Sequence, residues 1–94
     1  MLDLIAFDAD DTLWHNEVLY HQAQEQLARL LAPHAPQDKV DRRLFETEMR
    51  NLPVYGYGIK SFALSMIETA VAIKGGDIRG DQVSEITGYA RAML

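Results

Sequence analysis

The sequence predicts a mainly helical chain, with one short N-terminal strand followed by about four helices. The strand is predicted by a short apolar run, residues 2–7, which ends at the polar cluster of residues 8–12. The helices are predicted by apolar residues that recur every three or four positions after Asn16, interrupted by proline and glycine. Because one strand cannot form a sheet, we expect it to pair outside these 94 residues or with a second copy in a homodimer. The alternative is that it packs on the helices as an extended apolar arm.

Two helices are predicted in the first half of the chain. The first begins at Asn16, a good N-cap residue, with Glu17 in its first turn, and it ends before Pro33. The second begins near Pro36 or Gln37 and ends before Pro53, because proline suits a first helical turn and disfavours helical backbone in the residue before it. The apolar spacing predicts that the second helix buries Val40, Leu44, Phe45, Met49 and Leu52.

Two further helices are predicted after residues 54–58, a segment that fits either a rigid turn or a substrate-facing loop. The third helix has the most regular spacing in the chain, and Gly75 and Gly76 end it. The fourth begins near Asp81. The predicted buried residues are Ile59, Phe62, Ala63, Met66, Ile67, Ala70 and Val71 in the third helix, and Val83, Ile86, Ala90 and Met93 in the fourth.

Composition excludes several classes of function. Hydrophobic residues make up 48% of the chain and charged residues 24%, which is typical of a folded domain rather than a disordered segment. A net charge of -5 argues against nucleic-acid and anionic-membrane partners. The absence of cysteine excludes disulfides, thiolate zinc sites and cysteine nucleophiles. With acidic residues inside its first apolar run and no membrane-spanning run, the chain is expected to be a soluble cytoplasmic protein.

The segment F-D-A-D-D-T-L-W, residues 7–14, places Asp8 and Asp10 just beyond the predicted strand, where open α/β sheets bind ligands. In the simplest interpretation, Asp11 or Thr12 caps a helical turn and the other acids are solvated. A calcium loop of the EF-hand kind is excluded, because leucine occupies the positions of the required glycine and the bidentate glutamate. In the third interpretation Asp8 attacks phosphorus as a nucleophile, and Asp10 acts as general acid and base.

Attack by an anionic carboxylate on an anionic phosphate needs a cation between the two. Magnesium prefers oxygen ligands and fits this role. Asp8 would supply a carboxylate oxygen and Asp10 its backbone carbonyl, which leaves the side chain of Asp10 free for proton transfer. The expected cofactor is therefore Mg²⁺, and the expected ligand is a small phosphorylated metabolite.

The string I-A-F-D-A-D-D-T-L-W resembles the first motif of the haloacid dehalogenase superfamily, an apolar strand followed by D-x-D-x-T. The resemblance implies that Asp8 is the nucleophile and a metal ligand, that Asp10 is the acid/base and a backbone metal ligand, and that Asp11 and Thr12 support the loop. An acid at position 10 is typical of the phosphatases and phosphomutases of that superfamily rather than its dehalogenases. Two residues are candidates to line the substrate entrance: Trp14 and Asn16, the predicted N-cap of the first helix.

The same resemblance implies a parent fold with a doubly wound α/β core and a helical cap. Residues 1–15 would be the first strand and nucleophile loop of the core, and residues 16–94 the cap. The phosphate-binding Ser or Thr, the Lys and the acidic pair of the superfamily have no secure counterpart here. Lys39, Lys60 and Lys74 are predicted to be solvated on helices, and the G-D-x-x-x-D spacing of residues 76–81 is interpreted as a turn between helices, with Asp81 as N-cap.

The expected function is magnesium-dependent hydrolysis of a phosphate monoester through an aspartyl-phosphate. The 94 residues alone are expected to catalyse this poorly, since most of the phosphate and metal site is missing. Two alternatives remain. One is a receiver-like signalling domain, which would need strands and helices in alternation. The other is a helical interaction module whose acidic loop is incidental.

Overall fold

The computed structural model describes the backbone of residues 10–94 and the side chains of residues 17–94. This part of the chain forms four helices, α1 (Asp10–Leu31), α2 (Gln37–Tyr55), α3 (Ile59–Ile73) and α4 (Gly80–Arg91), and contains no strand. The prediction of about four helices is confirmed. The predicted strand at residues 2–7 lies outside the described residues.

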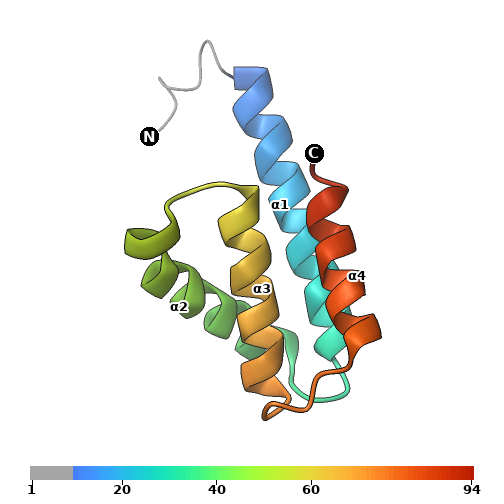
Figure 1. Cartoon of the computed structure of the whole chain (residues 1–94). Helices are drawn as coiled ribbons and strands as arrows, with labels where there is room; N and C mark the ends of the chain where they lie inside the picture. Colours follow the sequence, from blue (N-terminus) through green and yellow to red (C-terminus); the bar gives the residue numbers. More distant parts are fainter. Residues whose placement is uncertain (1–9) are drawn as a thin grey trace.

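The four helices pack as a bundle in which α1 and α3 each contact all the other helices (Figure 1). The contact between α2 and α3 is the most extensive in the bundle. The start of α1, the turn between α2 and α3, and the end of α4 all lie at one end of the bundle (Figure 1). The other two connections lie at the opposite end.

The core is built from apolar residues at helical spacing. Leu27, Leu31, Leu44, Met66 and Ile86 are fully buried. The spacing of the sequence located most of this core correctly. It consists of Ala23, Leu27, Ala28, Leu31, Ala35, Val40, Leu44, Phe62, Met66, Ala70, Ile86, Ala90 and Met93.

The start of α1 differs from the prediction. The helix begins at Asp10 rather than Asn16, so residues 10–12, predicted as a loop, have helical backbone and Asn16 is an interior position. Asp10 and Asp11 suit the first turn because the N-terminal end of a helix attracts negative charge. Neither glycine nor proline interrupts residues 10–16. The helix therefore crosses the predicted domain boundary between residues 15 and 16 without a break.

The end of α2 also differs from the prediction, because the helix continues through Pro53 to Tyr55. Proline has a φ angle compatible with a helix, but it cannot donate to the carbonyl of Met49 and its ring crowds that carbonyl, and only two further residues of α2 follow it. The helix ends instead at Gly56, which has a φ of 75° and donates its N–H to the carbonyl of Leu52 at 2.9 Å. Glycine tolerates that left-handed conformation.

The buried face of α2 was predicted only in part. Val40 and Leu44 are buried as expected, but Phe45 is 59% exposed and Met49 is 47% exposed. Thr47 and Asn51 are buried in their place. The buried face of α2 and the face predicted from apolar spacing differ by a rotation of about one residue around the helix axis. Apolar spacing alone therefore did not distinguish them.

The turn between α3 and α4 ends α3 as predicted. Gly75 and Gly76 have φ angles of 65° and 90°. Gly76 donates its N–H to the carbonyl of Val71 at 2.8 Å and Gly75 to that of Ala72 at 3.3 Å, the pattern of a Schellman motif. Residues 76–79 thus connect the two helices, whereas Gly80 and Asp81 already belong to α4.

The predicted N-cap of α4 is wrong by two residues. Arg79 holds that position, and its backbone N–H donates to the side chain of Gln82 at 3.1 Å. Asp81 lies in the first turn of α4 and accepts two hydrogen bonds from the Arg79 guanidinium, each at 3.1 Å.

Candidate functional site

The predicted catalytic residues lie at the beginning of the chain, and the structure describes only part of this segment. Asp8 falls outside the described residues. Asp10 is the first residue of α1, and Asp11, Thr12, Trp14 and Asn16 follow in its first two turns. Their backbones are placed, whereas their side chains are not among those described. The roles assigned to these residues therefore remain predictions.

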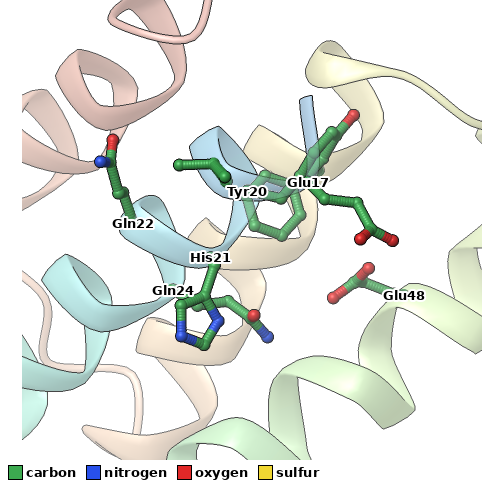
Figure 2. Close-up of a pocket in the computed structure, with 8 residues that line it drawn as sticks. Glu17, Tyr20, His21, Gln22, Gln24 and Glu48 are labelled. Atoms are coloured by element: carbon green, nitrogen blue, oxygen red, sulfur yellow. The ribbon is translucent and has the colours of Figure 1, made fainter. Parts of the chain in front are cut away.

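An open groove lies beside the same helix, starting seven residues after Asp10. Two turns of helix separate the two positions, a rise of about 10 Å. The groove has a volume of about 770 Å³ and lies between α1, α2 and α3 (Figure 2). It is lined by Glu17, Val18, Tyr20, His21, Gln22, Gln24, Glu48 and Phe62.

An aromatic pair joins α1 to α3 in the groove. The ring centroids of Tyr20 and Phe62 are 4.7 Å apart with an angle of 66° between the planes, an edge-to-face contact. Phe62 is almost completely buried, while Tyr20 is partly exposed. Tyr20 therefore presents aromatic surface to the groove, and Phe62 holds it in place.

Two carboxylates lie across the groove from each other. Glu17 extends from α1 and Glu48 from α2, and their carboxylate groups face one another (Figure 2). Partial burial raises the pKa of Glu48 above its ordinary value. Burial, followed by the negative charge of Glu48, raises the pKa of the Tyr20 phenol. The groove is therefore an acidic and partly desolvated environment.

A smaller hollow of about 240 Å³ shares Tyr20, Glu48 and Phe62 with the groove and reaches the turn between α2 and α3. That turn contains Gly56 and Gly58, both with positive φ angles, and Tyr57, which is 89% exposed. Residues 56–58 connect α2 to α3, since α2 itself extends to Tyr55, and the choice between a rigid turn and a substrate-facing loop stays a prediction. The turn lies at the same end of the bundle as the start of α1 (Figure 1).

The three lysines lie on helices or at a helix end, as the sequence predicted. Lys39 and Lys60 are exposed, and Lys74 donates a hydrogen bond to the side chain of Gln82 at 2.6 Å. The imidazole of His21 lies 3.5 Å from the carboxylate of Glu25 one turn later on α1, and both side chains are exposed. Among residues 17–94, no three His, Asp or Glu side chains come close enough together to hold a metal ion.

Comparison with known proteins adds no relative: no protein-family model matches the chain, and no curated protein resembles it in sequence. None of the helices in the described part of the chain is long and apolar enough to cross a membrane.

The groove itself was not predicted from the sequence. Phe62 was identified, but as a core residue, and Tyr20 and Glu48 carried no motif. The one available signal was Glu48, an acid that lies one turn from both Leu44 and Leu52 of the predicted apolar face of the second helix. Its significance depends on α1 packing opposite, which the spacing of residues within α2 does not encode.

Proposed function

We propose that this chain supplies the nucleophile loop and the helical cap of a magnesium-dependent phosphatase that acts on a small phosphate monoester. The observation that carries the proposal is the D-A-D-D-T spacing of Asp8, Asp10 and Thr12 directly after an apolar run. That spacing resembles the first motif of the haloacid dehalogenase superfamily, and the acid at position 10 favours phosphoryl transfer within it.

Each of the two acids has one chemical task in this proposal. A carboxylate oxygen of Asp8 forms a bond to phosphorus as the ester P–O bond breaks, and Asp10 donates a proton to the departing oxygen. Asp10 then removes a proton from water, which attacks phosphorus, releases phosphate and restores the Asp8 carboxylate. The Asp8 carboxylate and the Asp10 carbonyl are oxygen donors suited to Mg²⁺, which when bound neutralises charge between the carboxylate and the phosphate.

The helices that follow the motif support this proposal over a receiver-like domain. A receiver domain alternates strands and helices along the chain. Residues 10–94 instead form four helices in succession, the order expected of a cap inserted after the first strand. The groove lies on α1 only two turns beyond Asp10, so a substrate held by the motif would have a cap surface close to it.

The test is hydrolysis of a panel of small phosphate monoesters by the protein that carries these residues, with Mg²⁺ and with a chelator. Asp10→Asn is expected to lower kcat by about 10²–10⁴-fold, the usual contribution of a general acid/base. Asp8→Asn is expected to abolish formation of the aspartyl-phosphate, detected as incorporation of labelled phosphate that hydroxylamine releases. Asp38→Asn, an acid at the exposed start of α2, is the matched control and should retain activity.

Mg²⁺-dependent activity that survives Asp8→Asn would contradict the proposed nucleophile. The isolated 94-residue chain is expected to hydrolyse phosphate esters poorly or not at all. If this chain proved fully active, the phosphatase proposal would stand and the expectation of a missing site would be wrong.

One observation favours the alternative of a helical interaction module. Phe45 and Met49 lie one turn apart on α2, and both are substantially exposed. Such pairs often contribute to helix-mediated association. This alternative predicts that association survives replacement of Asp8 and Asp10 by Asn and weakens in Phe45→Ser, as measured by sedimentation velocity across a range of concentrations.

A further inference from the structure

We propose that the groove between α1, α2 and α3 binds an organic cation, either a protonated amine or a quaternary ammonium group. Three features of the described residues carry this proposal. These are the sign of the charge in the groove, the aromatic surface on its wall and its size. Because the groove is formed by residues 17–62, the binding itself does not depend on the proposed function.

The charge in the groove is negative and is not balanced locally. Glu17 and Glu48 face each other from opposite sides (Figure 2). Neither the groove nor the adjoining hollow has a lysine or arginine among its lining residues. Among residues 17–94, His21 is the other ionisable group that lines the groove besides Tyr20, and its imidazole has Glu25 as its partner. A ligand cation would therefore meet two carboxylates and no competing fixed cation.

The contrast with another hollow shows that this charge pattern is local. A hollow between α2 and the end of α3 is lined by Lys39, Arg42 and Arg43 together with a single acid, Glu46. Those cations lie beside the C-terminal end of α3, where positive charge is stabilising, and that helix has no basic residue in its own last turn. The basic hollow therefore has a structural explanation, whereas no lysine or arginine lines the acidic groove.

The aromatic wall and the size of the groove favour an organic cation over a metal ion. Tyr20 presents part of its ring, and aromatic faces attract ammonium groups within about 6 Å of the ring centre. A volume of about 770 Å³ is in the range of sites for small organic molecules. Divalent metals need several oxygen ligands at short distance, and no set of three acidic or histidine side chains occurs among residues 17–94.

One consequence rests on the proposed function as well. An acidic groove close to a phosphate site would repel a polyanionic substrate, whereas a cationic group in the alcohol part of the ester would offset that repulsion. If both proposals hold, the preferred substrate is a phosphate monoester of an amino alcohol or a quaternary amino alcohol. The binding experiment below uses no catalytic activity, so its failure and the failure of the phosphatase proposal are distinguishable.

The test is a titration of the ¹⁵N-labelled 94-residue chain with choline chloride, followed through backbone amide shifts at constant ionic strength set by sodium chloride. We expect saturable shifts at Tyr20, Glu48 and Phe62 with a dissociation constant on the order of 1 mM, as is reasonable for so small a ligand. The neutral isostere 3,3-dimethylbutan-1-ol has the same shape without the charge and should bind at least about fivefold more weakly, since it forms no ion pair.

Glu48→Gln should weaken choline binding by about two- to fivefold, and the Glu17→Gln, Glu48→Gln double variant should weaken it further. Glu46→Gln is the matched control, because it removes the same charge from the same helix at a residue that lines the basic hollow. Its binding should equal that of the parent chain, and far-ultraviolet circular dichroism should show all variants equally helical. Equal binding of choline and its neutral isostere, unchanged binding in the double variant, or no shift in the groove would each overturn the proposal.

Discussion

The two sides of the bundle are held together by different chemistry. From residue 17 onward, all the buried residues of α1 and α4 are apolar, with Leu27, Leu31 and Ile86 at their centre. By contrast, the four buried polar residues among residues 17–94 all come from α2 and α3. They are Thr47, Asn51, Ser65 and Thr69.

Hydrogen bonds make the α2–α3 contact specific. Asn51 donates to the hydroxyl of Ser65 and to the carboxylate of Glu68, each at 3.0 Å. Thr47 and Thr69 donate to carbonyls one turn earlier on their own helices, at 2.8 and 2.7 Å. Apolar contacts stabilise without strong direction, whereas hydrogen bonds fix relative position because they depend on geometry. We infer that α1 and α4 contribute mainly burial and that Asn51 sets the alignment of α2 against α3.

The largest effect is expected on the apolar side. Leu27→Ala removes a fully buried side chain and should lower the free energy of unfolding by about 2–5 kcal/mol. The measurement is urea denaturation followed by circular dichroism. Leu64→Ala is the control, because Leu64 is 40% exposed on α3 and should lose about 1 kcal/mol or less. Equal losses in the two variants would mean that α1 does not pack as described.

Asn51→Ala tests the polar side and should cost about 1–3 kcal/mol, because the buried Ser65 hydroxyl loses its donor and Glu68 loses one partner. The same denaturation experiment measures it. A double-mutant cycle with Ser65→Ala should show a coupling of about 0.5 kcal/mol or more, since the two side chains are in contact. If the losses of stability in the two single variants simply added up in the double variant, the Asn51–Ser65 hydrogen bond would not align α2 with α3.

Two neighbouring residues of α2 test which of its faces is buried. Leu44→Ala should cost about 2–5 kcal/mol, because Leu44 is fully buried. Phe45→Ser removes a larger apolar side chain, yet it should change stability by only about 0.5 kcal/mol, because Phe45 is mostly exposed. A larger loss of stability in Phe45→Ser than in Leu44→Ala would mean that the face predicted from apolar spacing, which includes Phe45, is the buried one.

The sequence predicted the four helices and most of the core because these depend on local spacing and on Pro and Gly positions. It misplaced the start of α1 because Asn16 is a good cap wherever a helix begins, while the acids at positions 10 and 11 favour an earlier start. It chose Phe45 and Met49 over Thr47 and Asn51 because the burial of Asn51 depends on partners on another helix. The motif at Asp8 and Asp10 is local and was identified, whereas the groove requires three helices to come together.

The smallest expected effect concerns Glu48, which lies next to buried Thr47 but has no hydrogen-bond or ion-pair partner among residues 17–94. Burial raises its pKa above 4.5, so the folded chain binds the proton more tightly than the unfolded chain. The stability that this protonation contributes is complete below pH 4.5 and is lost as the pH rises through the folded pKa. Glu48→Gln should therefore raise the urea midpoint slightly at pH 7 relative to the parent chain, and this advantage should shrink as the pH falls through the folded pKa of Glu48 toward 4.5.

The matched control for this prediction is Glu46→Gln, which removes the same charge from an exposed position of the same helix. A loss of stability in Glu48→Gln at pH 7 would show that the carboxylate has a stabilising partner and would contradict the description of the groove. Glu48→Gln is thus expected to raise stability and to weaken the binding of choline. Both effects have the same physical cause. A carboxylate that is partly desolvated without a partner destabilises the free protein and is available to a cationic ligand.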